Sequence, residues 1–475
     1  MKRTTRRAVF YASLCCIALS CVLFWQGARQ TVPTVAQPDP PPVSLPSSAV
    51  SPLPSSAPVL PVSSAAQTVP RETLLEDARA ALTALEKTGA AAEAAASAQR
   101  LVPLLRDSGE IVVADALARV LAYQNGLQTG KKGKVAFGAA AERLGVPVEQ
   151  FQAAGAACYL RGQKKAGQVT LTFTGDCTFS PINEQSHYNS FDQVYARQPS
   201  ASYPFDRMQP WFLTDDITCI NFEGTLTDST AHQEKQYYFR GSPSFARILP
   251  ASSVELAGLA NNHTYDYGKR GFEDTKRYLH AAGVSTFAVG QPYITRVNGI
   301  EVVLLGQRTN AGATDMINQI KRYKRPDNLV IPVMHWGVEF SNRVTPDTMA
   351  AGRKMIDAGA DLVIGHHAHV VQGIEVYKGK YLVYNLGNFA FGANVGPVTA
   401  RRTFAFRASF GLRGGSLVMT DCSIIPCDPT SDPSGWNNYQ PKPLFGQEAK
   451  AVADFLVELS QSMPYGAAEL SYFDC

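Results

Sequence analysis

Strong net charge is absent from this chain of 475 residues. Its 44 Lys and Arg residues and 40 Asp and Glu residues leave a formal net charge of +4, so no overall attraction to nucleic acid is expected. The chain has no Cys-x-x-Cys pair, which excludes a zinc ribbon, and no internal repeat, which excludes a repeat architecture. Its 45% hydrophobic content permits a sizeable buried core. We expect no nucleic-acid partner.

Cysteine is scarce, and its positions indicate no fixed disulfide framework. Cys177 and Cys219 lie in apolar runs, which is typical of small buried thiols. Cys422 and Cys427 are close enough in sequence to pair across a turn, so a disulfide is permitted there without being required. The remaining cysteines are Cys15, Cys16, Cys21, Cys158 and Cys475.

The N-terminal segment carries basic residues followed by an uncharged run of 18 residues from Ala8 to Trp25. A run of this length reaches the lower end of the roughly 17 to 25 residues that span a bilayer. The preceding basic residues predict that the rest of the chain lies outside the cytoplasm. No Ala-x-Ala cleavage site follows closely, and the sequence around Cys21 departs from a lipoprotein box. We therefore predict an uncleaved single-pass signal anchor at residues 1–27.

Composition divides the rest of the chain into four segments. Residues 28–70 are rich in Pro, Ser and Ala and are predicted to be an extended linker, while residues 71–167 have apolar residues at helical spacing and are predicted to be a small helical region. Residues 168–430 alternate between strand and helix patterns. Residues 431–475 are expected to be a C-terminal extension that ends in a helix near 447–463.

Residues 139–151 of the helical region have the sequence pattern of a helix-turn-helix, with Gly145 at the turn. DNA recognition is disfavoured, because the second helix is not basic and the region is expected outside the membrane. We predict an ordinary helical hairpin.

Beyond residue 168 the alternation predicts an α/β fold with strands that are buried on both faces. The expected strands are 169–174, 217–221, 254–259, 302–306, 329–334 and 362–365, and helices are expected at 269–282 and 347–358.

Polar motifs follow these strands directly. They are Thr174-Gly175-Asp176, Asn221-Phe222-Glu223-Gly224, Ala260-Asn261-Asn262-His263, His335-Trp336-Gly337 and Gly365-His366-His367-Ala368-His369. Ligands in open α/β sheets gather outside the carboxyl ends of strands, so these motifs are expected to share one edge. Alternate residues of an extended segment point the same way, which predicts that His367 and His369 converge. Carboxylate, amide and imidazole groups together suit one or two divalent ions.

Each motif also has an ordinary structural explanation when it is taken alone. Asp176 could be a turn residue, Asn262 and His263 an Asx turn with a helix cap, His335 a core histidine, and Glu223 a helix-start carboxylate. The recurrence of such motifs at five strand ends favours a shared metal site.

The order and spacing of six motifs resemble the CapA family of poly-γ-glutamate capsule proteins, relatives of the calcineurin-like metallophosphoesterases. The motifs are T-G-D, N-F-E-G, A-N-N-H-x-x-D-x-G, H-W-G-x-E, G-H-H-A-H-V-V-Q and Y-N-L-G-N-F. The resemblance covers a little over half of the chain. It implies a sandwich of two β-sheets flanked by helices, with one or two Mn, Fe or Zn ions at the strand ends.

The resemblance also implies roles for individual residues. The implied metal ligands are Asp176, Glu223, Asn262, His335, His367 and His369, while His366 matches no metal position. His263 matches the catalytic imidazole, and Asp266 either orients it or caps the following helix. Thr178 stands where phosphoesterases carry a histidine in a D-x-H motif, and Asn221 is either a substitute oxygen ligand or a structural residue.

Two functions follow from the resemblance. The first is a membrane-anchored, metal-dependent phosphoesterase-like hydrolase in the synthesis of poly-γ-glutamate or another envelope polymer. The second is a non-catalytic protein that handles or helps export the polymer and has a structural or vestigial metal site. The expected partners are an anionic polymer or phosphoester, the membrane and capsule-synthesis membrane proteins. The basic cluster at 321–325 either attracts such a polymer or is a solvated helical face.

Overall fold

The computed structural model describes residues 69–125, 137–394, 396–398 and 400–473. The predicted signal anchor at 1–27 and nearly all of the predicted linker lie outside these ranges. Within the described residues, no helix is both long and apolar enough to cross a membrane.

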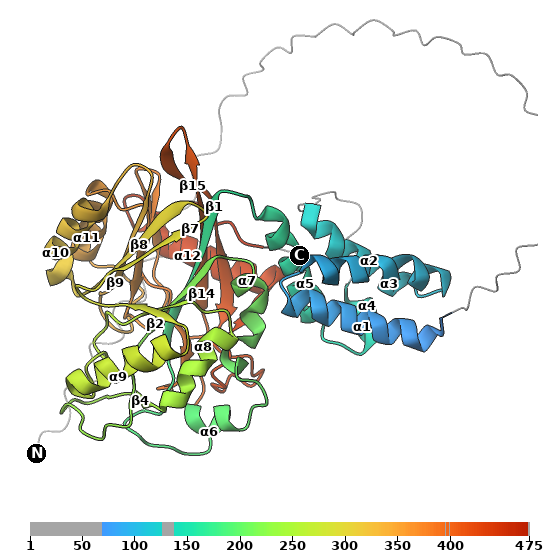
Figure 1. Cartoon of the computed structure of the whole chain (residues 1–475), viewed down its shortest axis with the longest axis horizontal. Helices are drawn as coiled ribbons and strands as arrows, with labels where there is room; N and C mark the ends of the chain where they lie inside the picture. Colours follow the sequence, from blue (N-terminus) through green and yellow to red (C-terminus); the bar gives the residue numbers. More distant parts are fainter. Residues whose placement is uncertain (1–68, 126–136, 395, 399, 474–475) are drawn as a thin grey trace, which may run out of the picture. The chain divides into compact units, whose positions relative to one another are not determined.

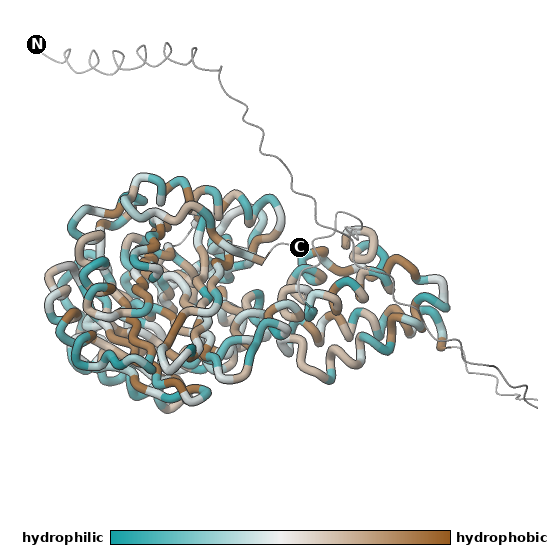
Figure 2. Tube along the Cα trace, turned by 90° about the horizontal axis from the view of Figure 1, so that it is seen from above, coloured by the Kyte–Doolittle hydropathy of each residue, from teal (hydrophilic) through white to brown (hydrophobic). Residues whose placement is uncertain are grey.

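Five helices form a bundle in the first part of the described chain (Figure 1). They are α1 (Arg71–Lys87), α2 (Ala92–Asp107), α3 (Ile111–Ala122), α4 (Phe137–Leu144) and α5 (Val148–Gln163). Each of these helices carries both apolar and polar residues, which Figure 2 shows as brown and teal stretches of the tube.

Helix α5 packs against α1, α3 and α4 and buries residues along most of its length, including Phe151 and Cys158. The chain reverses between α4 and α5 through Gly145, which has a positive φ of 63°. These two helices form the expected hairpin, and α5 is a packed core helix rather than an exposed recognition helix.

Two β-sheets follow the helical bundle (Figure 1). The eight-stranded sheet has the order β16-β15-β14-β1-β2-β5-β6, with β13 also paired to β1, and the six-stranded sheet has the order β11-β12-β10-β9-β8-β7. The first sheet contains β1 (Gln168–Thr178), β2 (Ile217–Phe222), β5 (Leu256–Gly258), β6 (Ser285–Phe287), β13 (Asn388–Phe391), β14 (Thr403–Arg413), β15 (Ser416–Asp428) and β16 (Lys442–Pro443). The second contains β7 (Tyr293–Val297), β8 (Ile300–Arg308), β9 (Leu329–His335), β10 (Val363–His366), β11 (Ile374–Tyr377) and β12 (Lys380–Val383).

The two sheets share one hydrophobic core, because side chains alternate across each strand. In β9, Leu329, Ile331 and Val333 join the core between the sheets, whereas Val330 and Met334 face helices α10 (Ala313–Tyr323) and α11 (Pro346–Asp357). Helix α9 (Gly268–Ala281) covers the outer face of the first sheet, and α12 (Gly446–Gln461) packs beside β15 and β11. The predicted α/β fold is confirmed, with helices outside two packed sheets.

The strands that precede the polar motifs are parallel within each sheet. These are β1, β2 and β5 in the first sheet, and β9, β10 and β12 in the second. Each of the six expected strands is present, although β5 is shorter than expected. The carboxyl ends of parallel neighbours lie at the same edge, so the fold gathers the motifs as the spacing predicts.

Cysteine positions correct one expectation. Cys422 and Cys427 lie on the same strand, β15, so no turn separates them. Residues five apart on a strand point to opposite faces, which prevents them from pairing. These two and Cys158, Cys177 and Cys219 are free, and the expected burial of Cys177 and Cys219 is confirmed.

Gly175 allows a close approach between β1 and the segment before β13. A Cβ atom at this position would lie 2.0 Å from the carbonyl oxygen of Gly387. We expect Gly175→Ala to lower the free energy of unfolding by about 1–3 kcal/mol, because the backbone must shift to relieve the overlap. Gly138→Ala is the matched control, since its Cβ would meet no atom within 4 Å. Urea unfolding of both variants measures the difference, and equal stability would contradict this packing.

Candidate metal centre

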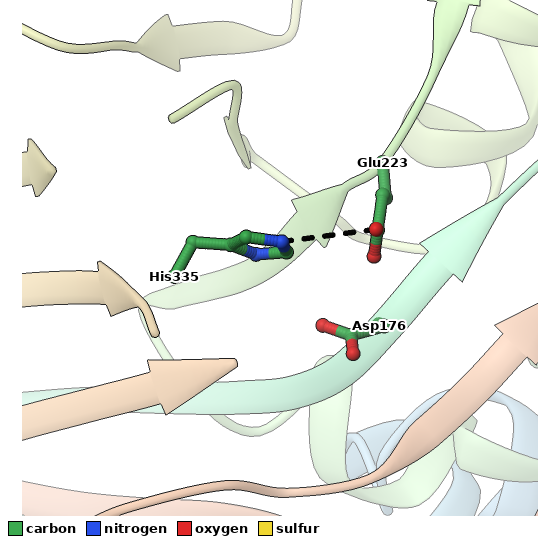
Figure 3. A group of neighbouring side chains, drawn as sticks. All are labelled: Asp176, Glu223 and His335. Carbon is green, nitrogen blue, oxygen red and sulfur yellow. Dashed lines mark ion pairs between the residues drawn. The ribbon is translucent and has the colours of Figure 1, made fainter. Parts of the chain in front are cut away.

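Three buried side chains from three strand ends face one another (Figure 3). Asp176 lies near the end of β1, Glu223 directly follows β2, and His335 is the last residue of β9. One potential ligand atom from each lies within 4.8 Å of the others. His335 Nε2 is 3.7 Å from Glu223 Oε1, across the gap between the two sheets. These residues therefore offer two carboxylates and an imidazole to one small volume.

Glu223 is the clearest sign that this volume suits a cation. Both of its carboxylate oxygens are buried and have no hydrogen-bond partner. Burial raises the pKa of this carboxyl to about 8, since the charged form is taken out of water and the nearby His369 only partly offsets that cost. A divalent ion would supply the missing partner, so the donor set fits a metal.

Asp176 is held in its ionised form by its neighbours. Asn221 Nδ2 donates a hydrogen bond to Oδ1 at 2.8 Å, and the Nδ1 atoms of His366 and His369 each lie 3.3 Å from a carboxylate oxygen. Burial alone would raise the pKa of Asp176, but the neighbouring imidazoles of His366 and His369 hold it well below its usual range. The amide oxygen of Asn221 accepts a hydrogen bond from Asn261 Nδ2 at 3.2 Å. Its contacts favour the structural role for Asn221.

Asn262 and His335 present their donor atoms to the same point. His335 Nε2 lies 2.8 Å from Asn262 Oδ1, and the same nitrogen faces Glu223. Burial holds the pKa of His335 well below its usual range, which keeps the imidazole neutral. A neutral imidazole is the form that binds metal ions.

The histidine-rich segment does not have the extended conformation that the sequence suggests. Strand β10 ends at His366, and His367 and His369 have positive φ angles of 101° and 59°. The predicted extended conformation of residues 367–369 is therefore wrong, although the side chains of His367 and His369 still reach the site through this turn. The His367 ring is 4.6 Å from the His335 ring, and His369 Nδ1 contacts Asp176.

His366 is closer to the centre than the sequence argument allows. Its Nδ1 atom is 3.3 Å from Asp176 Oδ1, and the residue is buried. The family pattern provides no metal position for it, so its contribution could be found only from the strand pairing that sets His366 beside His335.

Asp266 orients His263 rather than capping a helix. Its Oδ2 atom lies 2.7 Å from His263 Nδ1 and also accepts the backbone N–H of Phe239 at 2.7 Å. Helix α9 has Tyr267 as its N-cap residue and no side-chain capping bond, so the capping alternative is wrong. The opposite ring nitrogen, Nε2, lies 3.8 Å from Glu223 Oε1. His263 therefore faces the proposed metal centre with one nitrogen and is held by the other.

Lys235 completes this arrangement, and no sequence motif indicated it. Its Nζ atom lies 2.7 Å from Asp266 Oδ1 and 3.2 Å from the carbonyl oxygen of Asn262. The lysine thus links the residue that orients His263 to the backbone of a candidate ligand. It lies in an irregular segment between β3 (Thr225–Leu226) and β4 (Arg240–Gly241), where periodicity carries no information.

Metal affinity should depend steeply on pH. Burial alone would lower the pKa of His369, but the carboxylates of Glu223 and Asp176 raise it to about 10. Burial also raises the pKa of Glu223 to about 8, so the interacting Glu223 and His369 side chains together hold protons that a metal ion would have to displace. Because both groups must lose protons to bind a metal, affinity for Mn²⁺ should rise about tenfold per pH unit for each proton displaced, between about pH 6 and pH 8. Calorimetric titration in two buffers of different ionisation enthalpy counts those protons, and a pH-independent affinity would contradict the assignment.

Residues of the site line two clefts. One, of about 450 Å³, is lined by His263, His369 and Glu339 together with aromatic side chains such as Phe239 and Phe391. The other, of about 630 Å³, is lined mainly by polar residues that include Asn262, His335, His367 and Arg308. Trp336 also lines the second cleft.

The basic cluster at 321–325 is partly neutralised within the protein. Lys324 lies 2.5 Å from Asp361, and Arg325 pairs with Glu301. These internal ion pairs reduce the charge that the cluster offers to a polyanion.

The part of the chain that carries this site is similar to known proteins. Residues 170–393 match the family model described as "Bacterial capsule synthesis protein PGA_cap". The "Capsule biosynthesis protein CapA" of Bacillus anthracis is 30% identical over 255 residues, which are 47% of this chain and 60% of that protein. The "PGA biosynthesis protein CapA" of Bacillus subtilis (strain 168) is 29% identical over 220 residues, which are 41% of this chain and 58% of that protein. The chain therefore spans about 60% of the length of these curated relatives.

A solved structure, the calcineurin-like phosphoesterase YfkN from Bacillus subtilis, aligns with 62% of this chain and 98% of its own chain. The sequence identity is 12% and the TM-score is 0.34.

Proposed function

Because residues 170–393 belong to the bacterial capsule synthesis family, we propose that this chain acts in the synthesis of a capsule or another anionic envelope polymer. We further propose that it hydrolyses a phosphoester at the centre formed by Asp176, Glu223 and His335. The observation that carries the second proposal is the buried carboxylate of Glu223, which has no hydrogen-bond partner. The names of the relatives support the first proposal, a role in the synthesis of a capsule or another envelope polymer.

The proposed metal ligands come from both sheets. Asp176, Glu223 and His335 would hold a divalent ion such as Mn, Fe or Zn, with Asn262, His367 and His369 as neighbouring donors. When bound, such an ion would supply Lewis acidity toward a phosphoryl oxygen and lower the pKa of water.

The chain's own residues would manage the proton and the substrate. Asp266 fixes the His263 ring through Nδ1, which leaves Nε2 directed toward Glu223. From that position His263 would donate a proton to the leaving oxygen or stabilise its negative charge. Lys235 and the Phe239 N–H hold Asp266 in place, so His263 keeps its orientation. Burial of these groups excludes bulk water and strengthens their electrostatic interactions.

The proposed location is the outer side of the cell membrane. Residues 1–27 would anchor the chain and residues 28–70 would hold the folded part away from the bilayer, where membrane proteins of capsule synthesis would be its partners. Support comes from the basic residues before the apolar run.

Thr178 favours a second candidate function, polymer handling without catalysis. It occupies the position of the expected histidine, and its buried hydroxyl has no hydrogen-bond partner. A site that lacks this imidazole is better suited to one ion than to two, and a single ion can serve a structural purpose.

Metal analysis and hydrolysis assays of the purified full-length protein separate the two functions. The substrates are p-nitrophenyl phosphate, bis(p-nitrophenyl) phosphate and γ-glutamyl-p-nitroanilide, each with and without EDTA. Phosphoester turnover that EDTA abolishes supports the hydrolase. Bound metal without turnover of any substrate supports polymer handling, and absence of bound metal at neutral pH contradicts the metal centre.

A further inference from the structure

Arg308 is a cationic residue beside the candidate metal centre that neither the motifs nor the proposed chemistry uses. It is the last residue of β8, and its register partner on β9 is His335. The residue is exposed, and it forms no ion pair with any acidic side chain among the described residues. No acidic side chain among the described residues therefore neutralises its guanidinium charge.

The backbone around Arg308 is fixed at both of its ends. Its own N–H donates to Gln307 Oε1 at 2.9 Å, and the N–H of Thr309 donates to the carbonyl oxygen of His335 at 2.8 Å. Thr309 has a positive φ of 67°, which turns the chain sharply after the strand. Arg308 is thus attached to a rigid strand end next to His335 rather than to a free loop.

Arg308 lines the larger of the two clefts, together with Asn262, His335 and His367. The one acidic residue that lines this cleft is Asp315, in the first turn of α10, and it forms no ion pair with Arg308. The smaller cleft is lined by Glu339 and by no Lys or Arg residue. Of the two clefts that reach the centre, the Arg308 cleft is therefore the one that offers an anion a guanidinium group with several N–H donors.

We propose that Arg308 binds an oxyanion group of the substrate, a phosphate or a carboxylate, in the cleft beside His335 and His367. The planar guanidinium presents paired N–H donors that match two oxygens of either group. Arg308 is then the residue that selects anionic substrates, and it acts by binding rather than by proton transfer. This assignment rests on the proposed function for its substrate, but anion binding can be measured without turnover.

The test compares Arg308→Gln with Arg322→Gln in the full-length protein. Arg322 is exposed on α10 outside the cleft and forms no ion pair among the described residues, so both changes remove one equivalent charge. Inorganic phosphate and tri-γ-glutamate are titrated into each protein by calorimetry, and circular dichroism checks that each variant is folded. Arg308→Gln should weaken binding of at least one anion by about tenfold or more, while Arg322→Gln leaves both unchanged.

The two anions distinguish the sources of the oxyanion. Loss of phosphate affinity alone assigns Arg308 to a phosphoester, and loss of tri-γ-glutamate affinity alone assigns it to the polymer. Arg308→Lys, which keeps the charge but loses the paired donors, should bind with intermediate affinity. Unchanged affinity for both anions in a folded Arg308→Gln protein overturns the proposal.

Kinetics separate this proposal from the proposed hydrolase. With p-nitrophenyl phosphate, Arg308→Gln should raise KM about tenfold and change kcat by less than about threefold. If the unmodified protein turns over no phosphoester, the hydrolase is wrong, and the calorimetric comparison alone decides whether Arg308 binds the anion.

Discussion

Glu223→Gln should remove the bound divalent ion and lower phosphoester turnover by at least about a hundredfold. The substitution keeps the size of the side chain but removes the negative charge, and both oxygens of this carboxylate lack any other partner. Metal content by mass spectrometry and hydrolysis of bis(p-nitrophenyl) phosphate measure the effect. Glu273→Gln, an exposed change on α9, is the control that should alter neither.

The same substitution should stabilise the metal-free protein, which distinguishes a functional residue from a structural one. A carboxyl whose pKa is raised from 4.5 to about 8 on folding destabilises the folded state increasingly as pH rises through that interval. Gln has no such penalty, so at about pH 8 the metal-free variant should exceed the original protein in free energy of unfolding by roughly a few kcal/mol. Urea unfolding in EDTA measures this gain. Lower stability of the variant at that pH would show that Glu223 supports the fold.

His263→Ala should lower turnover by about 10²- to 10⁴-fold and leave metal content unchanged. His263 faces Glu223 through Nε2 and is oriented by Asp266 through Nδ1, so its removal takes away a proton donor without taking away a proposed ligand. The matched control is His280→Ala, because His280 is exposed at the end of α9 and bonds Thr286.

The leaving group provides a further check on His263. A proton donor to the leaving oxygen is needed most when that oxygen is strongly basic, so the loss should be larger for phenyl phosphate than for p-nitrophenyl phosphate. Turnover that is unaffected by His263→Ala would remove this residue from the mechanism and leave the metal centre standing. Loss of metal along with turnover would instead assign His263 to the ligands.

The sequence predicts the strand-end location of the site because the responsible pattern is local. Each apolar run ends in a polar motif, and parallel pairing brings those ends to one edge. Spacing and family resemblance could therefore identify Asp176, Glu223 and His335 as neighbours. One potential ligand atom from each lies within 4.8 Å of the others.

Other features depend on the backbone in three dimensions and left no sequence signal. The positive φ of His367 replaces the expected extended segment with a turn, and His366 approaches Asp176 from the strand itself. Lys235 reaches Asp266 from an irregular segment 31 residues away. The position of Arg308 beside the site follows only from its pairing with His335. Periodicity describes faces of regular elements, so it could not predict contacts that loops create.

Anomalous X-ray scattering from crystals of the protein grown with Mn²⁺ would show whether these three residues bind the ion. We expect a manganese peak among Asp176, Glu223 and His335, with a carboxylate oxygen of Glu223 within bonding distance. A protein that is saturated with Mn²⁺ but shows no peak there, or shows one only at other residues, would contradict it.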